Sequence, residues 1–559
     1  MRRIALANGI LVPALLALLP ACGDDAPPCP SGFDECTGVC TDTTLDNDNC
    51  GACGTVCGDG MHCAASQCTS DAACTPACSP FGDCVDHACA EPLAAIQTIL
   101  YDGKATAFRD LYALQDRTFT LTKLDAATFP SDRVTDHALL PDGSVLLVAA
   151  ETEGVMELWR ASPRGGPLVK VSGPLAAGAS VLPGIVVSRD GSRVLYRESD
   201  DDQIDLYEVA LASPGVAHKV DDALRPGGQV SRVFALSNDG KRVAYIATQD
   251  ADSHDAYTVD LSGATPGPST RLDPDDVTDI WDLQLTGDGR RVVYRREEGG
   301  GRLALQVVDL ASPGVEHEIT YADGAEGHVE AYQVTEDGSA VVFTGSRNTF
   351  QESLWRASLA SPDDALQLVD GSKDDWVRAD FAVTHDGSRV YFRQVSGAFG
   401  FDRLFRVDVA RPGVTTQLSP DGDDSSEEAT DFVLADDERS LVYRGGADGA
   451  EGGDPTPGTD PVRLFDETYA PALYHLDLTL DSTPPPVRLN PDPPAGNGVA
   501  DGYVVSRDGR RTFYRADDDR PGSLDAYLSD LDVPGSARNI SPPLDEAADA
   551  TDVQRISRF

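Results

Sequence analysis

Apolar runs alternate with short polar turns along this chain, and one pattern of this kind recurs about every 49 residues. Residues 185–196 read IVVSRDGSRVLY: an apolar run, a Ser/Thr-x-Asp-Gly turn, and a second apolar run that ends in an aromatic residue. Six turns of this kind contain the glycine, a seventh is degenerate (DDE, 436–438), and an eighth contains glycine again at Gly509. A repeat of this regularity predicts an array of one structural unit. The glycines of the first six turns lie 48 or 49 residues apart, at Gly143, Gly191, Gly240, Gly289, Gly338 and Gly387.

Each repeat contains four segments that are typical of β-strands. The two runs that flank the turn are the first two, and a third segment follows, as in residues 205–211 (DLYEVAL). A Pro-Gly turn such as Pro214-Gly215 then leads into a short fourth strand. Alternation and β-branched or aromatic enrichment favour strands, and the Asp-Gly and Pro-Gly pairs supply tight turns. Four antiparallel strands per unit, repeated many times, predict an all-β propeller.

The two ends of the chain supply parts of one further unit. Residues 551–559 match a first strand that stops before its turn, and residues 96–125 match the missing second to fourth strands. Pairing of the two ends would remove an exposed sheet edge. Eight complete units and one split unit make nine, whereas propellers usually have about four to eight blades. The expected fold is therefore a propeller of eight to nine four-stranded blades closed by its terminal segments, preceded by a small disulfide-rich module.

The repeat resembles a known type of propeller. The Ser-x-Asp-Gly-x-x-Val-x-Tyr motif with its following Asp-Leu-Tyr strand is similar to the WD40-like repeat of TolB and of the propeller domain of prolyl oligopeptidases, over roughly residues 96–559. The resemblance implies a periplasmic protein-binding scaffold, although the six blades and the α/β domain of TolB are not matched. The Gly-x-Ser-x-Gly elbow that a peptidase domain would carry does not occur in the sequence.

The first residues predict export and a lipid anchor. Arg2 and Arg3 precede an apolar stretch of signal-peptide length. Its end, Leu19-Pro20-Ala21-Cys22, resembles the lipobox of bacterial lipoproteins, which implies that Cys22 is lipidated. Gly23 follows instead of aspartate, so the resemblance implies the outer membrane. Ordinary cleavage that leaves Cys22 in a disulfide is the alternative. The expected divisions are signal peptide 1–21, lipidated tether 22–28, cysteine module 29–90 and propeller 91–559, with the insertion at about 446–470.

The remaining cysteines form a dense, even-numbered cluster. In an exported chain such a cluster predicts disulfides, although the pairing does not follow from spacing. Part of the cluster repeats one C-x3-C-x5-C-x4-C spacing, and a zinc site at Cys50-x2-Cys53 is the alternative. We expect a rigid spacer that holds the propeller away from the membrane. The twelve are Cys29, Cys36, Cys40, Cys50, Cys53, Cys57, Cys63, Cys68, Cys74, Cys78, Cys84 and Cys89.

The charge of the chain excludes one class of partner and suggests a polar face. Lys and Arg number 45 and Asp and Glu 92, so the net charge is −47 and nucleic acid is not expected to bind. Acidic loops at 200–202, 273–276, 421–428 and 517–519 are expected on one face of the propeller. A ring of aspartates seven residues before the turn glycine or its equivalent is a weak calcium candidate, with capping of local amides as the alternative. The ring consists of Asp136, Asp282, Asp380 and Asp431.

Catalytic motifs are absent from the sequence. The nine histidines are scattered, His-Glu-x-x-His does not occur, and no residue can be assigned a catalytic role. The aromatic residue of each third strand recurs at a fixed position, which favours packing between blades over a sugar-binding platform. We therefore expect a non-enzymatic scaffold on the periplasmic or outer side of the outer membrane, which binds an envelope protein or a surface ligand. No cofactor is expected apart from the candidate calcium. The alternatives are an exported hydrolase or lyase with its site in the propeller channel, and a cation-dependent adhesin.

Overall fold

The computed structural model describes most of the chain from residue 107 onward and short segments before it. The chain divides into two compact units, residues 1–77 with 84–89, and residues 78–83 with 90–559. No helix long and apolar enough to cross a membrane occurs within the described segments. These are 34–36, 39–41, 52–56, 61–64, 67–70, 83–85, 88–90, 92–101, 107–115, 121–124 and 134–558, the last without 153, 201–202, 250–252, 275–278, 320–326, 347–351, 372–374, 397–400, 421–427, 446–470, 480–484, 491–497, 507–508, 517–523 and 542–549.

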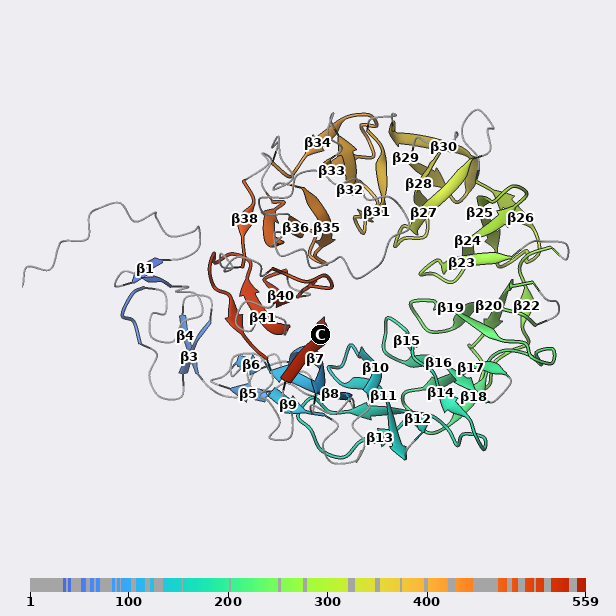
Figure 1. The fold of residues 1–559 in the computed structure, drawn as a ribbon, viewed down its shortest axis with the longest axis horizontal. Coiled ribbons are helices and arrows are strands. Elements are labelled where there is room, and N and C mark those ends of the chain that lie inside the picture. The colour runs from blue at the N-terminus through green and yellow to red at the C-terminus, as the bar shows by residue number, and fades with distance from the viewer. Residues whose placement is uncertain are drawn as a thin grey trace, which may run out of the picture. The chain divides into compact units, whose positions relative to one another are not determined.

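The second unit is an all-β propeller with eight blades, each built from consecutive strands. The blades follow one another around a ring, and the first strand of each blade lies nearest its centre (Figure 1). Blade 1 consists of β10 (Val134–Leu139), β11 (Val145–Thr152), β12 (Val155–Ala161) and β13 (Val169–Lys170), and blade 2 of β14 (Ser180–Val181), β15 (Val186–Val187), β16 (Arg193–Ser199), β17 (Ile204–Ala210) and β18 (Ala217–Lys219). Blade 3 consists of β19 (Val230–Leu236), β20 (Arg242–Ala247), β21 (Asp255–Asp260) and β22 (Thr270–Arg271), and blade 4 of β23 (Ile280–Leu285), β24 (Arg291–Glu298), β25 (Arg302–Asp309) and β26 (Glu316–Glu318).

Blades 5 to 8 repeat the same antiparallel order. Blade 5 consists of β27 (His328–Val334), β28 (Ala340–Ser346), β29 (Ser353–Ser358) and β30 (Ser361–Val369), and blade 6 of β31 (Val377–Val383), β32 (Arg389–Ser396), β33 (Phe401–Asp408) and β34 (Thr415–Gln417). Blade 7 consists of β35 (Ala429–Leu434), β36 (Ser440–Gly445), β37 (Ala472–Asp477) and β38 (Val487–Arg488), and blade 8 of β39 (Val504–Val505), β40 (Arg511–Ala516), β41 (Asp525–Asp530) and β42 (Arg538–Asn539).

A further sheet contains strands from both ends of the second unit. Its order is β43 (Ala550–Arg558), β7 (Pro92–Tyr101), β8 (Ala107–Gln115) and β9 (Leu121–Lys123). The last strand of the chain therefore pairs with β7 in the position of a first blade strand, with Ala550 opposite Tyr101.

The first unit contains short hairpins. They are formed by β1 (Asp34–Cys36) with β2 (Val39–Thr41), and β3 (Met61–Ala64) with β4 (Gln67–Ser70). A third pair, β5 (Asp83–Val85) with β6 (Ala88–Ala90), falls on both sides of the division between the units. Cys53 takes part in a disulfide. The other predicted bridges and the lipidated Cys22 are not assigned by the described residues and stay predictions.

The Ser/Thr-x-Asp-Gly segments form the tight turns that the sequence predicts. In blade 3 the Ser237 hydroxyl donates to the Asp239 carboxylate (2.8 Å) and accepts from the N–H of Arg242 (3.0 Å). Gly289 of the next turn has a φ of +68°, and a Cβ added to it would lie 3.1 Å from the Cβ of Ser237. Glycine is required there for its positive φ and for this close approach. Each turn thus packs against the turn of the preceding blade.

These turns gather at one mouth of the ring. Arg189 of the second turn forms an ion pair with Glu336 of the fifth turn. His385 of the sixth turn lies between two carboxylates, with Nδ1 2.6 Å from Glu438 and Nε2 3.3 Å from Glu336. Side chains from well-separated blades therefore meet at this mouth, and the beginnings of the first strands lie at the other.

The core repeats from blade to blade. The aromatic residue of the third strand stacks on an aromatic residue directly opposite it on the second strand, as in Tyr196 with Tyr207 (centroids 5.8 Å apart) and Tyr514 with Tyr527 (5.4 Å). Stacked pairs of this kind add to the free energy gained by burying apolar surface. The third-strand aromatics therefore pack within the propeller, as expected.

Candidate functional site: paired charges on the first strands and a cavity between two blades

Three members of the aspartate ring bind an arginine on the neighbouring strand. Asp282 lies directly opposite Arg295, and the Nε of Arg295 donates to its carboxylate at 2.9 Å. Arg444 binds Asp431 in the same way, with Nε–Oδ2 2.9 Å. In blade 6 the Nη2 of Arg393 donates to the Oδ1 of Asp380 at 2.9 Å. Each arginine follows its aspartate by 13 residues, because an antiparallel hairpin with this turn places the two side by side.

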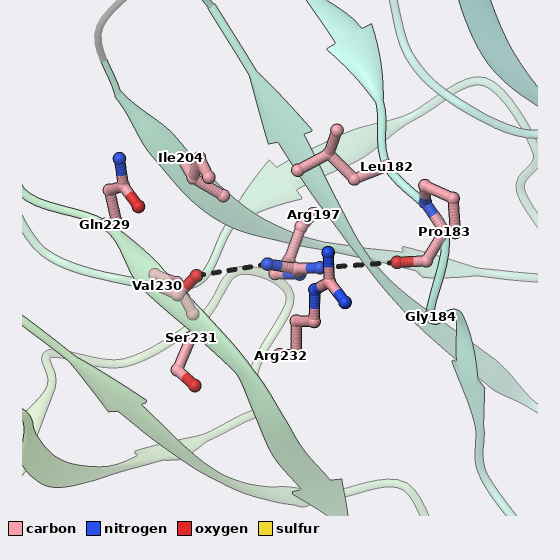
Figure 2. Close-up of a pocket in the computed structure, with 9 residues that line it drawn as sticks. All are labelled: Leu182, Pro183, Gly184, Arg197, Ile204, Gln229, Val230, Ser231 and Arg232. Carbon is pink, nitrogen blue, oxygen red and sulfur yellow. Dashed lines mark hydrogen bonds between the residues drawn. The ribbon is translucent and has the colours of Figure 1, made fainter. Parts of the chain in front are cut away.

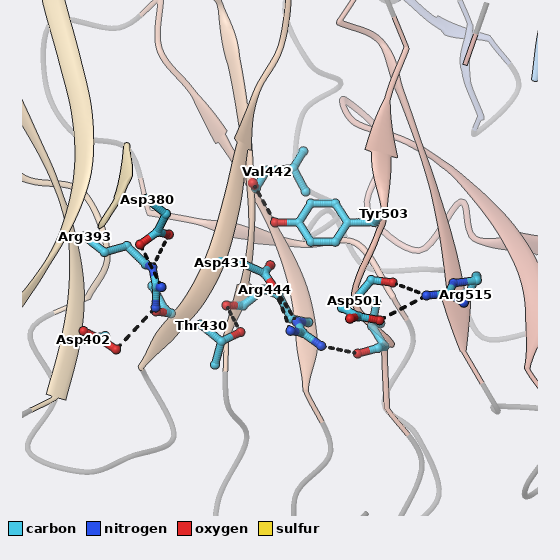
Figure 3. A network of polar contacts seen from close by, with 12 residues as sticks. Asp380, Arg393, Asp402, Thr430, Asp431, Val442, Arg444, Asp501, Tyr503 and Arg515 are labelled. Atoms are coloured by element: carbon cyan, nitrogen blue, oxygen red, sulfur yellow. Dashed lines mark hydrogen bonds and ion pairs between the residues drawn. The ribbon is translucent and has the colours of Figure 1, made fainter. Parts of the chain in front are cut away.

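The same arginines also connect their blade to the next one. Nη1 of Arg295 donates to the backbone oxygen of Val329 (3.3 Å), and Nη1 of Arg393 to that of Ala429 (3.0 Å). Nη1 of Arg444 reaches the oxygen of Val499 at 3.4 Å. The acceptor lies in each case at or just before the first strand of the following blade. Each Asp–Arg pair is therefore a structural link between blades, and Figure 3 shows the pairs of Arg393 and Arg444.

Tyrosines lie beside two of these pairs, and in the first the hydroxyl of Tyr332 donates to the backbone oxygen of Val293 (3.1 Å) near Arg295. The hydroxyl of Tyr503 in blade 8 donates to the backbone oxygen of Val442 in blade 7 (3.3 Å), beside the Asp431–Arg444 pair (Figure 3). Burial and the Asp431 carboxylate raise the pKa of Tyr503 well above its usual value. Burial lowers the pKa of Arg393, but the hydrogen bonds and the charge of Asp380 outweigh it and raise that pKa overall. These groups therefore keep one protonation state at neutral pH and do not exchange protons.

Asp136, the fourth member of the ring, has a different partner. Its Oδ2 accepts from the backbone N–H groups of Gly184 (2.8 Å) and Ile185 (3.2 Å) in blade 2. The described residues contain no group of three or more histidine, cysteine or acidic side chains placed to hold a metal ion. Calcium binding by this ring stays a hypothesis, and in this structure its oxygens accept from arginines and backbone amides.

Blade 2 departs from the pattern at the position of the ring aspartate. Gly184 stands there, seven residues before Gly191 and 13 before Arg197. The pairing of Val181 with Glu198 and the hydrogen bond from the N–H of Leu182 to the backbone oxygen of Arg197 (2.9 Å) place Leu182 opposite Arg197, and Gly184 follows two residues later. Gly184 has a φ of +98°, and open space surrounds the point where a Cβ would lie. Its strand is interrupted, with β14 and β15 on either side. Arg197 therefore lacks the carboxylate that its counterparts in blades 4, 6 and 7 bind.

Arg197 is buried, with 5% of its surface exposed. Its Nη1 and Nη2 donate to the backbone oxygens of Val230 (3.4 Å) and Pro183 (3.3 Å). Its Nε has no hydrogen-bond partner among the described residues. Burial and the nearby guanidinium of Arg232 lower the pKa of Arg197. A buried guanidinium with two long neutral hydrogen bonds and a second cation beside it is electrostatically unsatisfied.

A cavity of 590 Å³ opens at this guanidinium, between blades 2 and 3. Figure 2 shows Arg197 and Arg232 side by side, with apolar and polar side chains around them. The cavity lies where the first strands begin, at the opposite end from the packed turns. Its size is in the range of small-molecule sites. The lining residues are Leu182, Pro183, Gly184, Arg197, Ile204, Gln229, Val230, Ser231 and Arg232.

The expected acidic face is described only in part. Most of the acidic loops, including 517–519, lie outside the described residues. Asp273 was expected on this face but is buried, where it accepts from the N–H of Ala256 (2.8 Å) and binds Arg271 (2.8 Å). Burial raises its pKa to about 6. Asp221 holds the same place in blade 2, where it accepts from the N–H of Leu206 (2.7 Å). These two aspartates are strand caps inside the fold.

The sequence also contains a signal for these arginines, which the aspartate positions alone do not reveal. In blades 4, 6 and 7 an aspartate is followed by an arginine 13 residues later, and blade 2 keeps Arg197 while glycine replaces the aspartate. Arg232 carries no such signal, because the position before the ring residue varies between repeats, with Trp281 there in blade 4.

No protein-family profile and no curated protein matches the chain. Among solved structures, a TolB protein from Agrobacterium tumefaciens is 19% identical over 42% of this chain and 79% of its own, with a TM-score of 0.28. A prolyl endopeptidase is 13% identical over 69% of this chain (TM-score 0.40), and prolyl oligopeptidase B from Galerina marginata is 13% identical over 67% (TM-score 0.40). The chain spans 54% and 51% of the length of these two enzymes. At these levels of similarity the neighbours assign no activity to this chain.

Proposed function

We propose that this chain is a non-enzymatic binding protein of the bacterial cell envelope, and that its propeller presents a ligand site where the first strands begin. The composition of the cavity between blades 2 and 3 carries the proposal. None of its nine lining residues has an acid or base that titrates near neutral pH, whereas two are arginines and four are leucine, isoleucine, valine and proline. General acid–base or nucleophilic catalysis needs a titrating group beside the substrate. Such a lining is suited to holding an anion with an apolar body.

The rest of the chain fits a role in the envelope. We propose that Cys22 is lipidated, that the cysteine module stiffens the connection to the membrane, and that β43 closes the ring with β7, β8 and β9 as a ninth blade. An anchored, closed propeller keeps its binding face at a defined distance from the bilayer. Its net charge of −47 favours small or weakly charged partners over polyanions.

A capture experiment with matched variants tests the proposed function. The full-length protein with its disulfides formed is used as bait in detergent-solubilised envelope, with and without calcium. Wild type is compared with Arg197→Met/Arg232→Met and with Arg290→Met, which alters an exposed arginine on a turn of blade 4. We expect a partner that wild type and Arg290→Met retain and the double variant loses. Identical binding by all three baits, or turnover of peptide or glycan substrates by wild type, would contradict the proposal.

A further inference from the structure

The equivalent arginines of other blades show which group an arginine at the position of Arg197 binds. In three other blades the arginine at the same register has a carboxylate directly across the hairpin: Arg295 with Asp282, Arg393 with Asp380, and Arg444 with Asp431. These arginines keep the additional bond to the next blade, as Arg197 does with Val230. Blade 2 therefore keeps the arginine and its bond to the next blade, whereas its first strand is interrupted and carries glycine at the ring position.

The place of the missing carboxylate is open space and connects to the cavity. Gly184 lines the cavity, and no atom lies within 4 Å of the point where its Cβ would be. Arg197 lines the same cavity and is 95% buried, and its Nε, which is itself buried, has no hydrogen-bond partner among the described residues. Asp136 accepts from the N–H groups of Gly184 and Ile185, and no carboxylate of the described part of the chain is paired with Arg197, whose electrostatic surroundings are set by burial and by Arg232.

We infer that Arg197 and Arg232 bind the carboxylate of a ligand, in the place that the ring aspartate occupies in blades 4, 6 and 7. The inference rests on the proposed binding function and adds the chemical class of the ligand. A planar carboxylate can accept two parallel hydrogen bonds from a guanidinium, as Asp380 does from Nε and Nη2 of Arg393.

The surroundings of the two arginines define the rest of the ligand. Leu182, Ile204 and Val230 supply apolar surface, and the exposed Arg232 stands at the rim. A molecule with one carboxylate and an apolar body of a few carbon atoms fits this lining. Two sources share this chemistry: a free carboxylic acid, and the carboxyl end of a peptide that terminates in an apolar residue.

Titration calorimetry with acid and amide pairs tests the inference. The probes are N-acetyl-leucine with N-acetyl-leucinamide, and the tripeptide Ala-Ala-Leu with its amide, added to the full-length protein in detergent. We expect each acid to bind wild type at least about tenfold more tightly than its amide, because the amide cannot supply the negative charge. A tripeptide acid that binds more tightly than N-acetyl-leucine would identify a peptide end as the source, and equal affinities would identify the small acid.

Two variants separate ligand binding from structure. Arg197→Met should weaken binding of the acid at least tenfold and leave the melting temperature unchanged or higher, because it removes a buried, unpaired charge. Arg295→Met should leave the affinity unchanged and lower the melting temperature, because Asp282 loses its partner. Equal affinity for acid and amide, no binding of either acid, or unchanged binding by Arg197→Met would overturn the inference.

Phosphate is the remaining control. Inorganic phosphate that binds at Arg197 more tightly than N-acetyl-leucine would overturn the assignment to carboxylates. A partner captured from the envelope while both acids fail to bind would contradict this inference alone. Binding of the acids without any captured partner would contradict the protein-binding role and leave a carboxylate-binding propeller.

Discussion

At the scale of single residues, the partner of each charged side chain decides its role. Asp282 and Gly184 occupy the same repeat position, yet one completes a structural ion pair and the other leaves the buried guanidinium of Arg197 without a carboxylate. Asp221 and Asp273 resemble surface aspartates in the sequence but are buried strand caps. The energetic consequence of a substitution therefore depends on the partner that it leaves behind.

Removal of a ring carboxylate should destabilise the propeller. Asp282→Asn leaves Arg295 half-buried without its counter-charge, so we expect the free energy of unfolding to fall by about 1–3 kcal/mol. Asp309→Asn in the same blade removes an exposed ion pair, in which Oδ2 of Asp309 lies 3.7 Å from Nε of Arg291. This variant should change the free energy of unfolding by less than about 0.5 kcal/mol. Urea unfolding of both variants measures the difference. Equal effects would show that the ring pairs do not link the blades.

The buried Asp221 should make stability depend on pH. Burial raises its pKa to about 7, above the value of about 3.9 in the unfolded chain. Folding then favours the protonated form, so its contribution is complete below pH 4 and is lost as the pH rises to 7. Lys219, with Nζ 3.3 Å away, opposes this shift.

Asp221→Asn tests this dependence, because Asn490 already accepts the equivalent bond from Leu473 (2.9 Å) in blade 7. Relative to wild type, the variant should gain at least about 2 kcal/mol of unfolding free energy between pH 4 and pH 7. Denaturant unfolding over this pH range measures the difference. A constant difference would show that Asp221 is ionised throughout.

At the scale of the elements, each turn is both a local and an interblade structure. The Asp-Gly pairs form the turns within a blade, and the glycine lets the next turn approach, as Gly289 does at Ser237. The degenerate seventh turn places Glu438 at a φ of 55°, the one non-glycine residue with positive φ in the described segments. Its carboxylate binds His385 of the neighbouring turn. The turn geometry therefore persists where glycine is lost.

Two alanine substitutions separate backbone strain from packing. Gly314→Ala introduces only backbone strain, because its φ is +79° and no neighbouring atom lies within 4 Å of the new Cβ. It should lower the free energy of unfolding by about 1–2 kcal/mol. Gly289→Ala adds the approach to Ser237 and should cost about 1 kcal/mol more. Thermal unfolding of the two variants compares them. A smaller loss for Gly289→Ala would show that the turns do not pack as described.

At the scale of the whole molecule, the net charge of −47 opposes the compact state through self-repulsion. Raising the NaCl concentration from about 10 mM to about 100 mM shortens the screening length from about 30 Å to about 10 Å. We expect the melting temperature to rise, since repulsion among unpaired carboxylates outweighs the screened Asp–Arg pairs. A fall would show that the paired charges dominate stability.

The calcium hypothesis is tested on the same scale, by melting curves with EDTA and with calcium at matched ionic strength. We expect equal midpoints, because Asp282, Asp380 and Asp431 each bind an arginine. A midpoint that rises only with calcium would support a cation site at this ring.

The sequence alone determined the repeating part of this protein. The spacing of the turn glycines, the strand alternation and the Pro-Gly turns specify the four-stranded blades, because these signals act over a few neighbouring residues. The aromatic positions of the core followed from the same repeat. The 13-residue spacing of Asp282 and Arg295 was also readable, since both residues belong to one hairpin.

Only the tertiary structure decided which charges are buried and which lack a partner. The burial of Asp273, the contact of Gly289 with Ser237 and the meeting of Arg197 with Arg232 all join residues of different strands or blades. Such contacts depend on how the blades pack, and a local pattern does not encode that. The candidate site is a departure from the repeat, and it gains its chemical meaning only where the three-dimensional register shows which group is missing.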